Sequence, residues 1–413
     1  MPLDNTSPAL DALLLGAVLE MELSDRDLQV AEKRYHLIPE HLQRPSSAIR
    51  HLMGNARVYA QGSRAIGATI VDGGSDDRFD LDAILEFPTP FGWSPGQVLD
   101  ELEAAFRGFP DVRGIVRCTR CVQLQFAFMH LDVTPMNPFA EPRLERAGDI
   151  YHSPDRGRDE TFSVNPFGFA TWFAAQVVMP SPQFQMLVRD MRARMSVNDR
   201  MRAGTVFADA EIDALPAPVS PLRDAPQVIS LKLMKRFLNL RYSDRSMKRP
   251  VSVYLSKCAV EVPLSPFGIC SQLEDLATEL FRRMQFSLDT GRWPEERNPA
   301  FPEENFNDRW PKDVVAMKLF QEDLRHLLSQ LALARQSTLS EIQGIFDELF
   351  GERVSAKAIR GYADRLPAAA AGSYYERGKG FVAAPALLTA SSASVAEVSR
   401  APTHHFHAGW LKG

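Results

Sequence analysis

The sequence predicts an α+β fold in which a lobe built on a mixed sheet packs against a second, mostly helical lobe. Short β-type runs punctuated by glycine dominate residues 57–87, whereas the pattern from about residue 166 onward is helical. The chain has 413 residues, which is too long for one small domain and long enough for two packed lobes. We therefore expect a cleft between the lobes, where small-molecule sites usually lie.

The order of these patterns divides the chain into three segments. Residues 1–165 are expected to form the catalytic sheet lobe together with N-terminal helices, and residues 166–365 the helical lobe on the other side of the cleft. Residues 366–413 are rich in Ala and Ser and lack clear periodicity, which predicts a flexible C-terminal tail.

The first lobe begins with a helical pattern and continues with extended runs. Residues 8–45 read as helical, with a start at Ser24 and a stop in the proline-containing stretch 39–45. Extended runs follow at 57–60 and 79–85. Ser94-Pro95 then starts another helix with an apolar face.

Residues 122–128 alternate apolar and more polar side chains, which predicts one strand with a single buried face. This strand is expected to run directly into Asp132 and to end there. In the second lobe the helical pattern covers the ranges 166–178, 183–203, 223–242, 270–287, 311–335 and 338–350.

The charge balance weighs against a long nucleic-acid partner. The chain has 47 Lys+Arg against 52 Asp+Glu, a formal net charge of -5. Proteins that grip long RNA or DNA usually carry a basic balance, because phosphate neutralisation supplies most of their affinity. No apolar run approaches the roughly 20 residues that a bilayer requires. The N-terminus carries Asp4 and Asp11 in place of a basic signal start, so we expect no membrane partner and a cytoplasmic location.

The four cysteines do not predict a zinc site. Cys118 and Cys121 form a C-x-x-C, but a zinc ribbon requires a second close pair. Their surroundings read as a strand, in which positions i and i+3 point to opposite faces. We therefore interpret the cysteines as buried, reduced thiols.

The carboxylates of Asp80 and Asp82 are the first candidates for chemistry. Residues i and i+2 of a strand face the same side, so these two side chains point together while Leu81 points into the core. Asp132 can add a third carboxylate from a neighbouring strand. Like charges held together require compensation, and hard divalent cations prefer oxygen ligands.

The pattern therefore predicts a site for two Mg²⁺ ions, with Mn²⁺ as an alternative, held by Asp80, Asp82 and Asp132. Two ions about 4 Å apart stabilise both the attacking and the leaving oxygen of a phosphoryl transfer. Asp132 is expected to hold the ion at the attacking hydroxyl and to help lower the pKa of that hydroxyl.

Gln61-Gly62-Ser63 supplies a candidate phosphate site upstream of these carboxylates. Glycine lets backbone N–H groups approach a triphosphate closely, and the Ser63 hydroxyl adds a donor. A lone Gly-Ser is usually a loop, and a lone D-x-D is usually a solvated face. The combination of Gly-Ser, Asp-x-Asp at the head of an apolar strand, and a further strand ending in Asp is much more specific.

This combination resembles the nucleotidyltransferases of the polymerase β superfamily. The wider context is similar to one branch, the bacterial CD-NTases (cGAS/DncV-like nucleotidyltransferases) of CBASS anti-phage defence. The resemblance covers roughly residues 10–410 and rests on Gln61-Gly62-Ser63, His130-Leu131-Asp132-Val133-Thr134-Pro135, Asn165-Pro166, Phe169-Ala170-Thr171-Trp172-Phe173, Met234-Lys235-Arg236, Pro250-Val251-Ser252, Asn298-Pro299, Glu304-Asn305-Phe306-Asn307-Asp308-Arg309-Trp310 and His405-Phe406-His407-Ala408-Gly409.

The resemblance implies a polymerase β-like fold and adds two site residues. In the family a Lys on a helix and a Ser shortly after it contact a triphosphate, and Lys235 and Ser252 are the matching positions. An ammonium and a hydroxyl offset triphosphate charge, although the alternative for Lys235 is a solvated helix face and for Ser252 a helix N-cap. The family pattern G-S-x-x-x-G-T departs here at one position, where Ala68 stands in place of Thr.

The resemblance also implies the activity. We expect an Mg-dependent nucleotidyltransferase that joins nucleoside triphosphates into a cyclic di- or trinucleotide second messenger and releases pyrophosphate. The substrates are expected to be ATP together with GTP or a pyrimidine nucleotide. The residues alone support nucleotidyl transfer, so a template-independent RNA-tailing enzyme is the alternative. A CBASS regulatory partner, or a conjugating enzyme acting on the C-terminal Gly413, is a further expectation.

Overall fold

The computed structural model describes residues 8–71, 79–141, 144–202, 221–364, 373–376 and 380–383. The chain divides into two units, Met1–Arg365 and Leu366–Gly413. In the second unit, strands β10 (Ser373–Glu376) and β11 (Gly380–Ala383) pair as an antiparallel hairpin. The remainder of the predicted tail over 366–413 lies outside the described residues.

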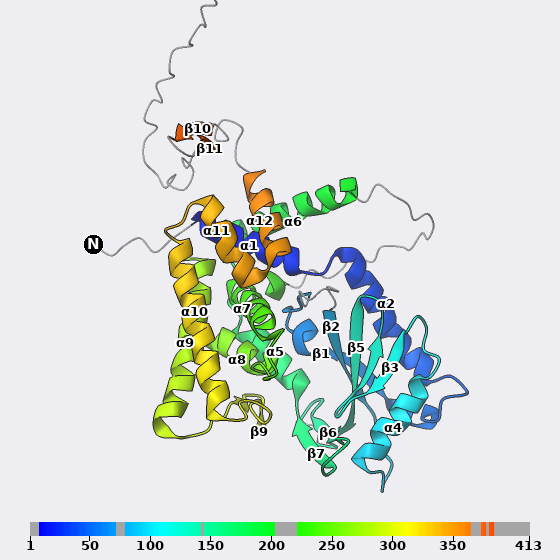
Figure 1. The fold of residues 1–413 in the computed structure, drawn as a ribbon. Helices are drawn as coiled ribbons and strands as arrows, with labels where there is room; N and C mark the ends of the chain where they lie inside the picture. Colours follow the sequence, from blue (N-terminus) through cyan, green and yellow to red (C-terminus); the bar gives the residue numbers. More distant parts are fainter. Residues whose placement is uncertain are drawn as a thin grey trace, which may run out of the picture. The chain divides into compact units, whose positions relative to one another are not determined.

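A seven-stranded mixed sheet forms one lobe of the first unit (Figure 1). Its centre is the parallel pair β2 (Phe79–Glu86) and β5 (Met129–Pro138). The remaining strands pair antiparallel with their neighbours, with β1 beside β2, β4 and β3 beyond β5, and β6 joining the end of β5 to β7. Their bounds are β1 (Arg57–Gln61), β3 (Gly114–Arg117), β4 (Val122–Gln125), β6 (Gly148–His152) and β7 (Glu160–Val164).

Helices α2 (Asp25–Leu42) and α4 (Pro95–Phe106), with the short η1 (Arg50–Asn55), share an apolar core with this sheet. The predicted helix starts are confirmed, because Ser24 accepts a hydrogen bond from the Asp27 N–H and Ser94 caps α4 in the same way. The predicted stop in the stretch 39–45 is also confirmed, since α2 ends at Leu42, with Pro39 inside the helix.

The single strand expected over 122–132 is wrong, because the structure has two antiparallel strands there. β4 ends at Gln125, and the Phe126 N–H donates to the Met129 carbonyl at 2.9 Å to close a tight turn. No Gly, Pro, Asn or Asp marks this turn, so its apolar residues read as a continuation of the strand. Asp132 consequently lies inside β5 and does not end a strand.

Cys118 and Cys121 also lie in a turn and not in a strand as expected. They bracket the connection between β3 and β4, where the Cys118 N–H donates to the Cys121 carbonyl at 2.8 Å. All four cysteines are free thiols. Cys258 and Cys270 are buried, as expected. Cys118 and Cys121 are partly exposed, so the expectation of burial is wrong for these two.

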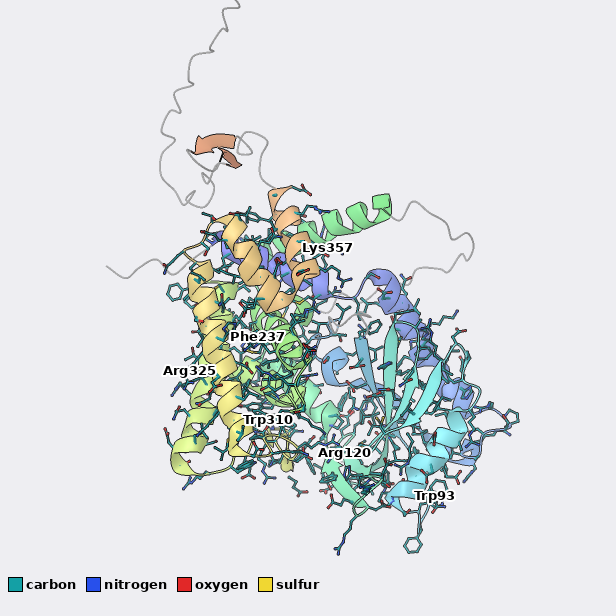
Figure 2. The ribbon with its side chains drawn as sticks, viewed as in Figure 1. Trp93, Arg120, Phe237, Trp310, Arg325 and Lys357 are labelled. Atoms are coloured by element: carbon teal, nitrogen blue, oxygen red, sulfur yellow. The ribbon has the colours of Figure 1, made fainter. Side chains whose placement is uncertain are left out.

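The second lobe packs helices around a separate apolar core (Figure 1). Phe237 and Trp310 are buried in it (Figure 2). The short helix α3 (Gly62–Ala65) follows β1 in the sheet lobe. The helical lobe contains α1 (Pro8–Met21), α5 (Pro166–Gln176), α6 (Pro182–Arg202), η2 (Pro221–Asp224), α7 (Pro226–Tyr242), α8 (Ser252–Glu261), α9 (Ile269–Thr290), α10 (Val314–Ala334), α11 (Leu339–Phe350) and α12 (Glu352–Ala363), with the hairpin β8 (Arg297–Asn298) and β9 (Phe301–Asn305). The six helical ranges predicted for this lobe are confirmed within a few residues by α5, α6, α7, α9, α10 and α11.

Helix α1 belongs to this second core, although it comes first in the chain. Its buried residues, Leu10 and Leu14 among them, pack with those of α7, α9 and α12. The division of the first unit at residue 165 stays a prediction. Among the described helices, none combines the length and the apolar character that a membrane crossing demands.

Candidate active site

A cavity of about 410 Å³ is lined by residues of both lobes. The sheet lobe contributes the ends of β1 and β2 and the middle of β5, and the helical lobe contributes α5, α7 and α8. Every site residue predicted from the sequence lines this one cavity, namely Gln61, Gly62, Ser63, Asp80, Asp82, Asp132, Lys235 and Ser252.

The sheet register brings the three carboxylates together. Asp80 and Asp82 alternate with core residues along β2, as the strand period requires. In the parallel pair, Asp82 lies directly opposite Asp132 of β5, and Asp80 lies opposite His130. Three acidic side chains from two adjacent strands therefore face the same cavity.

Burial and mutual repulsion disfavour the charged forms of these carboxylates. The pKa of Asp82 is raised to about 7, first by burial and then by the charges of Asp132 and Asp80. Burial likewise raises the pKa of Asp132. A hydrogen bond from Gln123 Nε2 to Asp132 Oδ1 at 2.9 Å acts in the opposite direction and lowers this pKa, but by less. Asp80 Oδ1 lies 3.5 Å from His130 Nδ1.

The donor set fits divalent cations such as Mg²⁺ or Mn²⁺. Carboxylate oxygens are the ligands that these hard ions prefer, and a bound cation would offset the burial and mutual repulsion that raise the pKa values of Asp82 and Asp132. With the side chains as they stand, the described residues contain no group of three or more His, Cys, Asp or Glu arranged around one metal position. Asp80 and Asp132 turn instead toward His130 and Gln123.

A tight turn places Gly62 and Ser63 against the carboxylates. β1 ends at Gln61, and the chain enters the short helix α3 with Gly62 at φ 59°, a conformation that favours glycine. A Cβ at this position would overlap the carboxylate of Asp82. Gln61 donates from Nε2 to Thr134 Oγ1 of β5 at 3.3 Å, which ties the turn to the central strands.

Lys235 joins the two lobes at this turn. Its ammonium donates to Ser63 Oγ at 2.7 Å and to the Ala68 carbonyl at 2.8 Å, and the side chain is buried. Burial, followed by the neighbouring charge of Arg249, lowers the pKa of Lys235 to about 7. The solvated helix face considered for Lys235 is therefore wrong.

Ser252 is the first residue of α8 and does not cap it. The N-cap position belongs to Val251, and the Ser252 hydroxyl accepts a hydrogen bond from Arg249 Nη1 at 3.2 Å. The N-cap alternative is thus wrong, because the hydroxyl lines the cavity in place of binding the helix backbone.

Several further cavity residues were not singled out in the sequence. Arg249 directly precedes the Pro250-Val251-Ser252 stretch, and Glu304 and Phe306 lie in another stretch that supported the resemblance. No spacing rule assigned a role to these residues, because they lie far from the carboxylates in sequence and reach the cavity only through the packing of the lobes. Phe169 and Asn239 also belong to this group.

Known proteins are similar to this chain in sequence and in fold. A scan against protein-family profiles finds no match. The chain is 30% identical to the cyclic dinucleotide synthase CdnG of Bradyrhizobium diazoefficiens, over 98% of this chain and 96% of that protein.

Solved structures extend the comparison. The Bradyrhizobium CD-NTase CdnG, solved in complex with GTP, superposes with a TM-score of 0.71 at 28% identity over 86% of this chain and 99% of its own. CdnC of E. coli MS115-1, solved in a CdnC:HORMA-deltaN complex, shares the fold at a TM-score of 0.52 and 14% identity, over 83% of this chain and 97% of its own. The nucleotidyltransferase fold predicted from the sequence is thereby confirmed. With identity to CdnG running over nearly the whole of both chains, this protein belongs to the CD-NTase family.

Proposed function

We propose that the protein is a nucleotidyltransferase that joins nucleoside triphosphates into a cyclic dinucleotide. The observation that carries the proposal is one cavity lined by Asp80, Asp82 and Asp132 beside the Gly62-Ser63 turn, with Lys235 of the other lobe bonded to that turn. The name of the relative CdnG supports a cyclic dinucleotide over the wider expectation of a di- or trinucleotide.

The proposed reaction consists of two chemically similar steps. A ribose hydroxyl of one nucleotide attacks the α-phosphorus of the other, the new P–O bond forms, and the bond to pyrophosphate breaks. The hydroxyl proton leaves to solvent. A second attack within the linear product closes the ring and releases a second pyrophosphate.

Residue roles follow from position. Asp80, Asp82 and Asp132 would hold two Mg²⁺ ions, with Mn²⁺ as an alternative, and the bound ions supply charge stabilisation for the attacking and leaving oxygens. The Gly62 and Ser63 backbone and the Ser63 hydroxyl would bind phosphate oxygens. Lys235 would add positive charge to the same phosphates, and Ser252 a hydroxyl donor from the opposite wall.

The relatives also suggest substrates and partners. CdnG was solved with GTP, which supports a guanine nucleotide among the substrates here, with ATP or a pyrimidine nucleotide as the other. A CBASS regulatory partner and a role in anti-phage signalling are proposed from the family alone, whereas CdnC, solved with a HORMA component, shows only the shared fold. Conjugation through Gly413 and a cytoplasmic location stay predictions from the sequence, and Gly413 lies outside the described residues.

A labelled-nucleotide assay tests the proposal. Pure protein incubated with the four labelled triphosphates and Mg²⁺ should give a phosphatase-resistant product of cyclic dinucleotide mass. The Asp80→Ala/Asp82→Ala variant should lose it by at least about a thousandfold, since the metal-held charge stabilisation is removed. Asp100→Ala is the matched control, because Asp100 is an exposed surface carboxylate outside the cavity.

Two results would count against the proposal. One is a wild-type protein that makes no such product, and the other is product that survives in the double variant. A parallel reaction with a generic RNA primer tests the alternative, because an RNA-tailing enzyme would lengthen the primer and form no small cyclic product.

A further inference from the structure

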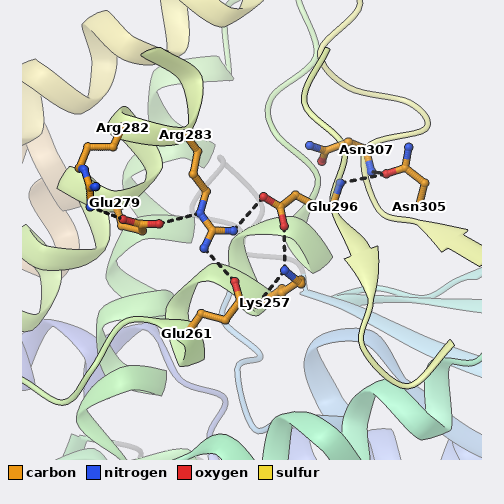
Figure 3. A network of polar contacts seen from close by, with 8 residues as sticks. All are labelled: Lys257, Glu261, Glu279, Arg282, Arg283, Glu296, Asn305 and Asn307. Carbon is orange, nitrogen blue, oxygen red and sulfur yellow. Dashed lines mark hydrogen bonds and ion pairs between the residues drawn. The ribbon is translucent and has the colours of Figure 1, made fainter. Parts of the chain in front are cut away.

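The hairpin β8–β9 contributes Glu304 to the lining of the active-site cavity, and hydrogen bonds to α8 and α9 hold the start of this hairpin in place. Glu296, just before β8, accepts hydrogen bonds from Lys257 Nζ of α8 at 2.7 Å and from Arg283 Nη1 of α9 at 2.8 Å (Figure 3). Its backbone N–H donates to Asn305 Oδ1 at 3.2 Å, and the Phe306 N–H donates to its carbonyl at 2.8 Å. The hairpin therefore presents its side chains from a fixed position.

Glu304 of β9 projects from this hairpin to the junction of two cavities. It lines the active-site cavity and also a neighbouring cavity of about 570 Å³. Val253 and Phe306 line both cavities as well, so the two spaces adjoin at an apolar surface on which a nucleobase ring can lie.

One oxygen of the Glu304 carboxylate is fully engaged. Oε2 accepts the Asn165 N–H at 3.0 Å and Asn298 Nδ2 at 2.7 Å. Asn298 is itself buried and donates again, from the same Nδ2, to the Asn165 carbonyl at 3.1 Å. These bonds fix the plane of the carboxylate before any ligand arrives.

The other oxygen is left to the cavity. No described residue donates a hydrogen bond to Oε1 of Glu304. This oxygen is also not among the fully buried polar atoms that lack a hydrogen-bond partner. A fixed, ionisable acceptor in a nucleotide cavity discriminates among donors, because an acceptor placed against it is repelled.

Base edges differ in this respect. Guanine is the base that places two adjacent N–H donors, N1–H and N2–H, on its Watson–Crick edge. Adenine and cytosine pair their amino donor with a ring-nitrogen acceptor, and uracil flanks a single N–H with two carbonyls. A carboxylate acceptor therefore favours guanine when it reads that edge.

We propose that Glu304 is a specificity-determining residue that selects guanine at one nucleotide position, by accepting from both N1–H and N2–H through Oε1. The inference rests on the proposed function and names one of its substrates. It assigns Glu304 to base recognition and gives it no part in the chemical step.

Glu304→Gln is the sharpest variant. The amide oxygen can keep the bonds from Asn165 and Asn298, while the –NH₂ group replaces the free acceptor with a donor. With equimolar ATP, GTP, CTP and UTP, mass spectrometry of the product should show guanine incorporation relative to adenine falling by roughly tenfold to a hundredfold, the range expected for unpaired polar groups. Glu303→Gln is the matched control, since Glu303 is exposed and lines only the neighbouring cavity.

Further readouts keep the proposal falsifiable. In the wild type, GTP should outcompete ITP, which lacks the N2 amino group, and equal use of the two would overturn the base contact without any variant. A rise of KM in Glu304→Gln that is equal for all four triphosphates, with unchanged base ratio, would assign Glu304 to the ribose or to structure and would also overturn it. If the wild type makes no product, the proposed function fails separately, and calorimetric binding of GTP against ATP to both proteins still decides the role of Glu304.

Discussion

Asp82 and Gly62 constrain each other at the centre of the cavity. Asp82 is held opposite Asp132 by the sheet register, and the turn at Gly62 passes so close that no side chain fits between them. The positive φ of Gly62 adds a second requirement for glycine. The Gly-Ser motif therefore reflects both backbone conformation and the space that the carboxylate occupies.

Gly62→Ala should abolish most activity while the protein remains folded. The added Cβ must displace either the turn or the Asp82 carboxylate, and a displacement of about 1 Å at a reacting centre costs roughly a hundredfold in rate. Product formation measured at saturating nucleotide checks this expectation. Gly54→Ala serves as the control, because a Cβ there meets nothing within 4 Å. Comparable losses in both variants, or full activity in Gly62→Ala, would contradict the argument.

The residues that share a local motif could be predicted from the sequence, whereas those that reach the cavity by packing could not. Asp80 and Asp82 follow from the strand period, and Gly62-Ser63 from phosphate chemistry. The bond from Lys235 to Ser63 spans the lobes, so sequence alone assigned Lys235 only through the family resemblance. Glu304 carried no signal of its own, because its position depends on a hairpin that the pattern did not reveal.

At the scale of elements, Glu22 joins the connection between α1 and α2 to three other segments. Its carboxylate accepts from Lys232 of α7 at 2.5 Å, from Arg192 of α6 at 2.6 Å and from Arg223 of η2 at 2.5 Å. Burial alone would raise the pKa of Glu22, but the three cations outweigh it and lower the pKa to about 2. Lys232 lies one turn before Lys235, so this cluster also fixes the helix that reaches the cavity.

Glu22→Gln should lower the free energy of unfolding by about 3 kcal/mol at neutral pH, since it leaves buried cations without their counter-charge. The folded pKa of about 2 lies below the unfolded value near 4.5, so the contribution is present above about pH 4.5 and is lost as the pH falls toward 2. Urea unfolding of both proteins at pH 7, 5 and 3.5 checks both points, and the difference between them should shrink at the lowest pH.

The neighbouring Glu20→Gln is the control for this measurement. Glu20 pairs with Lys357 at 3.0 Å near the surface, where a salt bridge contributes less than about 1 kcal/mol. A difference between wild type and Glu22→Gln that stays constant from pH 7 to 3.5 would show that charge on Glu22 does not support the fold.

Elements with strong local signals were predictable, and those with mixed signals were not. The capped helices α2 and α4 and the long amphipathic α9 and α10 were found from periodicity and start residues. The turn between β4 and β5 was missed, because Phe126 and Phe128 continue the apolar alternation through it. The pairs β6–β7 and β8–β9 were missed because their strands are short and largely polar, so tertiary pairing defines them.

At the scale of the whole first unit, the cavity depends on two separate apolar cores. The sheet core orients the carboxylates, and the helical core orients Lys235 and Ser252. Helix α1 links distant parts of the chain within the helical core, where Gly16 lies against Ala358 of α12 closely enough that an added Cβ would contact it at 3.5 Å. The first described helix of the chain therefore packs against the last helix of this unit.

Leu14→Ala should consequently destabilise the whole unit and not only the N-terminus. Leu14 is fully buried in the helical core, and truncation of such a residue costs about 3 kcal/mol, because a cavity remains where the side chain was. Leu333→Ala on α10 is the matched control, since Leu333 is 53% exposed and its loss should change stability by less than about 0.5 kcal/mol. Chemical unfolding followed by circular dichroism, with nucleotidyl transfer assayed on the same samples, measures the stability of both variants.

Because the helical core holds Lys235, the activity of Leu14→Ala should disappear at the same denaturant concentration as its helical signal. Activity that outlasts the helical signal, or equal stability of the two variants, would show that the cavity does not depend on α1.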